Sequence, residues 1–222
     1  MARPALTITD EDWKAMRNEL ENYRQARFWR DFTWHGSRMA VIEQRRFSEI
    51  PISDDDWIGM KRELEIHRMR QSWDAFAARY SRMKLINPQL AASVSISEQD
   101  WQSIIAVLSR LAMQQNWSNF ASHAHHIKIM DPGRLDSTKL RDQDWEAMRS
   151  QLERFRVGQE WSHFAKQASY MKIIDPGRFA DIPIADEEFE KMMGKLEDYR
   201  ANQYWGKFAA QASRIQTLLE GA

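Results

Sequence analysis

The stretch ISDDDWIGMKRELEIHRMRQSWDAFAARYSRMKLINP, residues 52–88, is one copy of a unit that recurs along the whole chain. Four sets of residues repeat with a step of 44: Trp13, Trp57, Trp101, Trp145 and Phe189; Trp29, Trp73, Trp117, Trp161 and Trp205; Leu20, Leu64, Leu108, Leu152 and Leu196; and Phe32, Phe76, Phe120, Phe164 and Phe208. A fixed period of this size is typical of a repeat architecture. We therefore predict five units, near residues 8–51, 52–95, 96–139, 140–183 and 184–222, in a single repeat domain over residues 1–222.

The composition narrows the classes of function. Lys plus Arg number 32 and Asp plus Glu number 32, so the formal net charge is zero. A neutral chain lacks the global charge that attracts nucleic acid or an anionic membrane, and neither is favoured as a partner. There is no cysteine, which excludes disulfides and thiolate metal sites. No apolar run approaches the ~18 residues of a membrane span, and the opening residues lack the apolar core of a signal peptide. We expect a cytoplasmic protein.

Each unit opens with residues that favour the start of a helix. In unit two, Ser53 suits the N-cap and Asp56 suits the third helical position, as in a capping box. The same pattern recurs at Thr9 with Asp12 and at Ser97 with Asp100. Units four and five have Arg141 and Ala185 at the cap position, so we expect Asp142 and Asp186 to cap one residue later.

The ends of the predicted helices are marked by proline in three units, at Asn87-Pro88, Asp131-Pro132 and Asp175-Pro176. Unit one has no such signal, and we expect its helix to run to about Phe47. Between start and stop lie two apolar stripes on nearly opposite helical faces. The residues between the stripes contain no strong turn former. We therefore favour one long helix per unit, at residues 10–46, 54–86, 98–130, 142–174 and 186–219, in an elongated bundle or α-solenoid; the alternative is a helical hairpin with its turn near residues 68–72.

Unit three differs from the others in charge. Between Trp101 and His126 its only charged residue of the Asp, Glu, Lys or Arg type is Arg110, whereas unit two carries many in the matching stretch. A helix with so little charge is expected to be surrounded on most sides. We predict either that unit three lies at the centre of a bundle, which we prefer, or that it forms a partner or self-association face.

Two groups of side chains are candidates for binding. His123 and His126 share a helical face and are weak candidates for metal ligands, although no carboxylate lies close in sequence to complete a shell. We expect no metal and no cofactor. Arginine recurs at equivalent places, and we predict partner binding by Arg24, Arg68, Arg156 and Arg200 and by Arg38, Arg82 and Arg214. Trp34 has no counterpart in the other units and is a candidate for an exposed anchor.

No enzymatic constellation of residues breaks the repeat pattern. Proteins built wholly of repeats usually bind rather than catalyse. We therefore expect a non-enzymatic scaffold that contacts protein partners, or other copies of itself, through repeated helical surfaces. The alternative is a ligand-binding helical bundle, with a small apolar molecule or a metal near unit three. Binding to nucleic acid or to a lipid surface is less favoured.

Overall fold

The computed structural model describes residues 5–138 and 140–220, and these residues form fourteen helices and no strand. The all-α class and the five 44-residue repeats are confirmed. The predicted unit boundary at Lys139 lies outside the described residues. Every repeat contains a long outer helix followed by a long inner helix, and the first four repeats add a short helix before the next repeat begins.

The helices have closely similar bounds in each repeat. The outer helices are α1 (Asp10–Gln25), α4 (Asp54–Met69), α7 (Glu98–Met113), α10 (Asp142–Val157) and α13 (Asp186–Ala201). The inner helices are α2 (Trp29–Ile42), α5 (Trp73–Ile86), α8 (Trp117–Met130), α11 (Trp161–Ile174) and α14 (Trp205–Leu219). The short helices are α3 (Gln44–Phe47), α6 (Pro88–Ala91), α9 (Pro132–Ser137) and α12 (Pro176–Phe179).

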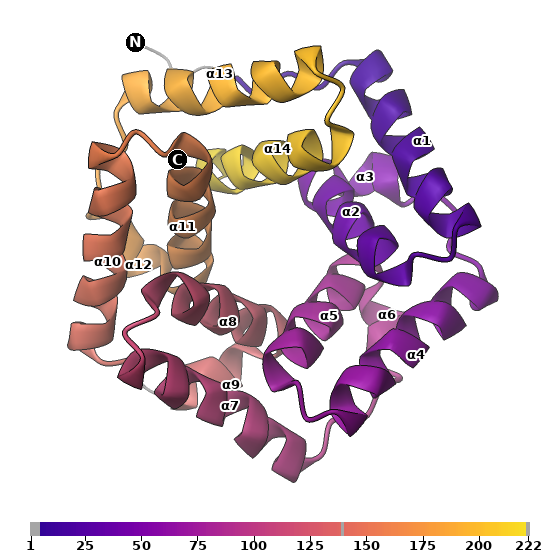
Figure 1. Cartoon of the computed structure of the whole chain (residues 1–222), viewed down its shortest axis with the longest axis horizontal. Coiled ribbons are helices and arrows are strands. Elements are labelled where there is room, and N and C mark those ends of the chain that lie inside the picture. Colours follow the sequence, from indigo (N-terminus) through magenta and orange to yellow (C-terminus); the bar gives the residue numbers. More distant parts are fainter. Residues whose placement is uncertain (1–4, 139, 221–222) are drawn as a thin grey trace.

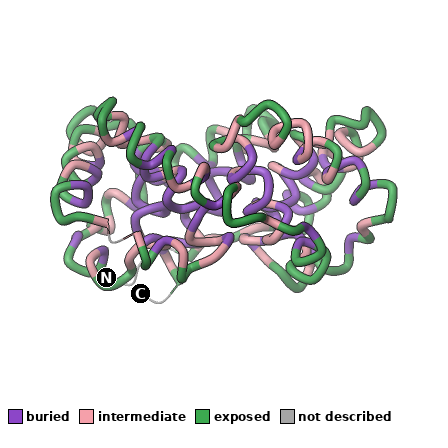
Figure 2. Tube along the Cα trace, turned by 90° about the horizontal axis from the view of Figure 1, so that it is seen from below, coloured by how far each residue is buried: buried purple, intermediate pink, exposed green. Residues whose placement is uncertain are grey.

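The five repeats close into a ring, with the outer helices along the sides of a pentagon and the inner helices around its axis (Figure 1). Each inner helix packs against the next, and α14 returns to pack against α2. In the perpendicular view the ring is wider than it is thick, and the exposed residues follow its outer edges (Figure 2). The array is therefore neither an open solenoid nor an elongated bundle, because the turn between successive repeats brings the fifth repeat against the first.

The prediction of one long helix per repeat is wrong, and the alternative of a helical hairpin is confirmed. Two residues after the end of each outer helix lies a residue with left-handed backbone, with φ from 52° to 57°: Arg27, Gln71, Gln115, Gln159 and Gln203. In repeat one, the Phe28 N–H donates to the Tyr23 carbonyl and the Arg27 N–H to the Arg24 carbonyl, which is a Schellman motif. Glycine usually fills the left-handed position. Glutamine or arginine fills it here, so the turn has no signal in the sequence.

The helix starts follow the capping residues. Thr9, Ser53 and Ser97 each form a full capping box. In repeats four and five the helices start at Asp142 and Asp186 themselves, so the prediction that these aspartates are the caps is wrong. The N-cap stays at the same place because its backbone N–H still donates to an acid three residues on, as Ala185 does to Glu188 at 2.8 Å.

The inner helices stop where the prolines predict, and α2 stops at the equivalent place without one. Its C-cap Glu43 has extended backbone with φ of −155°, like Asn87 at −151°. The helix therefore ends at Ile42, and a separate short helix carries Phe47 into the core. The prediction that the first helix runs on to Phe47 is wrong.

One hydrophobic core runs around the ring between the two layers of helices. The outer helices contribute one apolar stripe to it and the inner helices contribute the other. Because the ring is closed, every repeat has a neighbour on both sides, and no repeat is central. Leu20 in repeat one is 0% exposed and Leu108 in repeat three is 5% exposed. The prediction that unit three lies at the centre of a bundle is therefore wrong.

A candidate anion-binding site at the centre of the ring

Five equivalent side chains, one from each inner helix, gather around the axis of the ring. They are Arg38 on α2, Arg82 on α5, His126 on α8, Tyr170 on α11 and Arg214 on α14. The inner helices surround this axis (Figure 1). The charge of Arg38 in repeat one acts on His126 in repeat three and on Tyr170 in repeat four. Repeats one and three do not adjoin, and neither do repeats one and four, so these side chains point toward the centre.

The three arginines of this group have no carboxylate partner. No ion pair between the described residues includes Arg38, Arg82 or Arg214, and the Nε atom of each is buried without a hydrogen bond. Arg38 lies over the ring of Trp34, 6.0 Å from its centroid. A buried charge without a counter-ion is costly, so an anion at this place would stabilise the ring.

Burial lowers the pKa values of two of these arginines, Arg82 and Arg214. Burial, with Arg38 as the next cause, lowers the pKa of Arg82 to about 9. Burial also lowers the pKa of Arg214, to about 10, although the nearby Tyr170 opposes the shift. Both values are above 7, so both guanidinium groups keep their charge at neutral pH. The ring therefore concentrates positive charge at its centre.

Tyr170 is the group on the axis that can supply negative charge. It is 3% exposed, and burial alone would raise its pKa. The cations of Arg38, Arg214 and Lys166 outweigh burial and lower the pKa of Tyr170 to about 7. The ammonium nitrogen of Lys166 lies 5.9 Å from the centroid of the Tyr170 ring. Near neutral pH the phenolate is thus a partial counter-ion for the arginines.

Two histidines complete the surroundings of the axis. The Nδ1 atom of His126 is 2.8 Å from the Ser81 hydroxyl, and the ring of His125 stacks on Tyr170 with centroids 4.4 Å apart. Burial, with Arg38 and Arg82 among the further causes, lowers the pKa of both histidines well below the usual value. Both are therefore neutral at pH 7 and act as hydrogen-bonding groups beside the arginines.

His123 lies on the same helix as His126, α8, but faces the outer helix and not the axis. Its Nε2 atom is 2.8 Å from the Ile104 carbonyl of the outer helix α7. His35, Gln167 and Gln211 bond the outer helix of their own repeats from the same position. His123 thus connects the two helices of its hairpin while His126 faces the axis. Among the described residues, no group of three or more His, Cys, Asp or Glu side chains could hold a metal ion.

The other four predicted arginines connect neighbouring repeats. We call the interface between consecutive repeats a seam, numbered by the repeat that precedes it, and we call Arg24, Arg68, Arg156 and Arg200 the seam arginines. Each pairs with an acid at the start of the next outer helix: Arg24 with Asp56 at 3.1 Å, Arg68 with Asp100 at 3.6 Å, Arg156 with Glu188 at 2.5 Å and Arg200 with Asp12 at 2.8 Å. Their guanidinium groups are therefore engaged inside the chain, and binding of a partner by them stays a prediction.

Trp34 is half-buried, not an exposed anchor. Its ring lies at the fifth seam, beside Gly206 of α14, where a Cβ would be 3.5 Å from the Trp34 Cζ3 atom. Together with Arg38, it extends the central group to the interface that closes the ring.

Sequence reasoning found Arg38, Arg82, Arg214, His126 and Trp34 but missed Tyr170 and Lys166. Tyr170 stands at the same 44-residue register as the arginines, and this register was the available signal. A tyrosine on an apolar stripe has the pattern of a core residue, however, so its place among cations could not be inferred.

No helix among the described residues has the length and apolar character that crossing a membrane requires. The chain matches no known protein family, no curated protein and no solved structure.

Proposed function

We propose that this protein is a non-enzymatic binding protein that holds a multiply charged anion at the centre of its ring. The observation that carries the proposal is the set of three arginines, Arg38, Arg82 and Arg214, which converge from three inner helices without a carboxylate partner. Hydrogen bonds between a guanidinium and an anion are charge-assisted and strong. The energetic cost of crowding the cations would be offset when the anion binds.

The donor set favours a phosphate group. The planar fork of a guanidinium matches phosphate geometry, and an ammonium such as Lys166 binds phosphate as a point charge. The two neutral histidines add hydrogen-bonding groups that do not repel an anion. We therefore propose inorganic phosphate or a phosphorylated small molecule as the ligand class.

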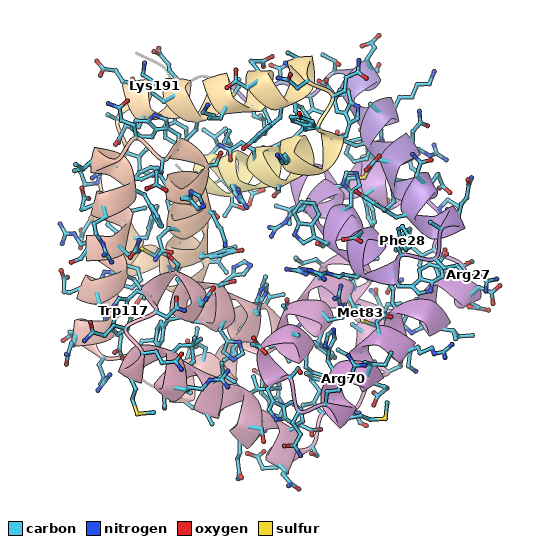
Figure 3. All side chains as sticks on the ribbon, in the orientation of Figure 1. Arg27, Phe28, Arg70, Met83, Trp117 and Lys191 are labelled. Carbon is cyan, nitrogen blue, oxygen red and sulfur yellow. The ribbon has the colours of Figure 1, made fainter. Side chains whose placement is uncertain are left out.

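The test is anion binding at constant ionic strength, measured by calorimetry with inorganic pyrophosphate as the probe. Arg82→Gln should weaken binding by about tenfold or more, because one charge-assisted contact contributes roughly 1.5–3 kcal/mol. Arg70→Gln is the matched control, because Arg70 is exposed and lies at an outer corner of the ring (Figure 3). Absence of pyrophosphate binding, or equal loss in both variants, would overturn the proposal.

The dependence of binding on pH is a second test. As pH rises through about 7, Tyr170 loses its proton, and its phenolate competes with the ligand for the arginines. Affinity should therefore fall as pH rises from 6 to 8, over and above the ionisation of the probe itself. Tyr170→Phe should remove this fall. Tyr204→Phe, at an exposed corner position, should leave it unchanged.

A scaffold role is the second candidate, and one observation favours it. Apolar side chains are exposed at the corners where outer and inner helices meet: Phe28, Met69, Met113, Val157 and Tyr204. Figure 3 shows Phe28 at one of these corners. Aromatic side chains and methionine are enriched in protein–protein interfaces, so these groups suit contact with a protein partner or a second copy. If the ring self-associates, its mass by light scattering should exceed 26.3 kDa, and the triple change Met69→Lys, Met113→Lys and Val157→Lys should return it to one chain.

A further inference from the structure

Four of the five seams contain the same arrangement around the seam arginine. In the first seam, Arg24 pairs with Asp56 of the next repeat, donates to the Pro51 carbonyl at 2.7 Å and lies 5.2 Å over the ring of Phe32. The second, fourth and fifth seams repeat these contacts with Arg68 over Phe76, Arg156 over Phe164 and Arg200 over Phe208. An acid, a backbone carbonyl and a phenyl ring therefore form a binding place for an arginine side chain.

The third seam, between repeats three and four, keeps part of this binding place but has no seam arginine. Ala112 stands where the seam arginine stands elsewhere, and Ser109 stands where Glu21 supports Arg24 in the first seam. The acid Asp144 and the ring of Phe120 are retained. Among the described residues, no cation lies over Phe120.

A groove opens at this seam. It has a volume of about 540 Å³ and is lined by Leu108, Ala112, Phe120, Leu140, Arg141 and Asp144, with further residues at its edge. Its walls are mainly apolar, and Asp144 gives it a carboxylate. An apolar channel that leads to an acid suits a side chain with an aliphatic stem and a cationic end.

Asp144 is neutralised from its own repeat. Arg141 donates to it from Nε at 2.9 Å and from Nη2 at 2.7 Å. The Arg141 side chain is 65% exposed, whereas that of Asp144 is 7% exposed. Because the Arg141 side chain is mostly in solvent, holding it in this pair costs side-chain entropy, so a guanidinium that reaches Asp144 through the groove can displace it.

We propose that the third seam is a docking site for an arginine side chain presented by a partner protein. The incoming guanidinium would pair with Asp144 and stack on Phe120, as the chain's own arginines do in the other four seams. Its aliphatic stem would lie along Leu108 and Ala112. This inference does not depend on the anion site, because the groove shares no residue with the centre of the ring.

The test uses an end-blocked Leu-Arg-Leu peptide, with the matching citrulline peptide as its uncharged control. The arginine peptide should bind once per ring. The affinity for the citrulline peptide should be lower by a factor of about ten or more, because the charge-assisted pair with Asp144 is lost. Arg141→Ser removes the competitor and installs the cap residue found at Ser53 and Ser97. This variant should bind the arginine peptide about tenfold more tightly.

Ala112→Arg supplies the missing seam arginine from the wall of the groove and should abolish peptide binding. Ile58→Arg is the matched control, since it adds the same charge at an exposed position on α4 and should leave binding unchanged. Equal affinity for the arginine and citrulline peptides would mean that the groove takes an apolar ligand, which overturns the proposal. So would undiminished binding by Ala112→Arg, or no binding by Arg141→Ser at millimolar peptide. If Ala112→Arg does not fold, the citrulline and Arg141→Ser measurements still decide.

Discussion

The fifth and third seams differ in whether the backbone links their two repeats directly and in whether they contain a seam arginine. At the fifth seam no peptide links the two repeats directly, and the ring is closed there by noncovalent contacts. Arg200 pairs with Asp12 through two contacts of 2.8 and 2.9 Å and also donates to the Thr7 carbonyl. At the third seam the chain runs directly from repeat three into repeat four, and no seam arginine is present.

This difference indicates what a seam arginine contributes. Where the backbone already holds two repeats together, as at the third seam, Ala112 takes the place of the arginine and α8 still packs against α11. Where the repeats are joined only by packing, the ion pair adds a specific link between residues 188 positions apart. We infer that an arginine at the seam stabilises the ring most at the fifth seam, where it closes the ring, and that it would contribute least at the third seam.

The largest expected effect on the free energy of unfolding comes from truncating a core leucine in repeat one or in repeat three. Leu20→Ala in repeat one and Leu108→Ala in repeat three should each lower the free energy of unfolding by about 2–5 kcal/mol, because both remove buried methyl groups and leave a cavity. In a closed ring the two losses should be similar, since repeat one has as many neighbours as repeat three. Urea unfolding measures both. A much smaller loss for Leu20→Ala would indicate that the ring opens in solution.

Breaking the ion pair that closes the ring should have the next largest effect. Arg200→Leu leaves Asp12, which is 3% exposed, without its cationic partner. Arg200 is itself partly exposed, so the expected loss is about 2–3 kcal/mol, less than the ~3–5 kcal/mol for a fully buried pair. Arg68→Leu, at a seam that the backbone bridges, is the matched control.

The two variants should differ in shape as well as in stability. Arg200→Leu should widen the distribution of distances measured by small-angle X-ray scattering, because the fifth seam is the one that can open without breaking the chain. Arg68→Leu should leave the distribution unchanged. Identical scattering from the two variants would show that closure does not depend on Arg200.

The repeat units, the helix starts and the proline-marked ends were predictable, because each depends on residues near one another in sequence. Ser53 with Asp56 is such a local signal, and the structure confirms it. The hairpin was not predictable from local signals, because Gln71 adopts the left-handed conformation that glycine usually supplies. Its cause is tertiary: the turn lets the stripes of both helices face one core. Likewise, Arg24 pairs with Glu21 as its spacing indicates, whereas its pairing with Asp56 depends on how neighbouring repeats stack.

Installing a seam arginine at the third seam should have a smaller effect than removing one elsewhere. In Ala112→Arg the new guanidinium would pair with Asp144 in place of Arg141, and it replaces a partly buried alanine. We expect the free energy of unfolding to change by about 1 kcal/mol or less, as for a partly exposed ion pair. A gain of several kcal/mol in urea unfolding would show that the third seam is a weak point of the ring and not only an open groove.

The smallest expected effect concerns the corners that precede the two seams. Gln115 precedes the inner helix at the third seam and Gln203 precedes that at the fifth, with φ of 52° and 56°. The left-handed conformation costs a residue with a Cβ about 1–2 kcal/mol, whereas glycine adopts it freely but loses more entropy on folding. Gln115→Gly and Gln203→Gly should therefore each stabilise the protein by about 0.5 kcal/mol. Because this strain is local to each corner, the two gains should be equal in urea unfolding. A gain at Gln203 alone would mean that closing the ring strains the corner beside it, and the difference between the two seams would then extend into the backbone.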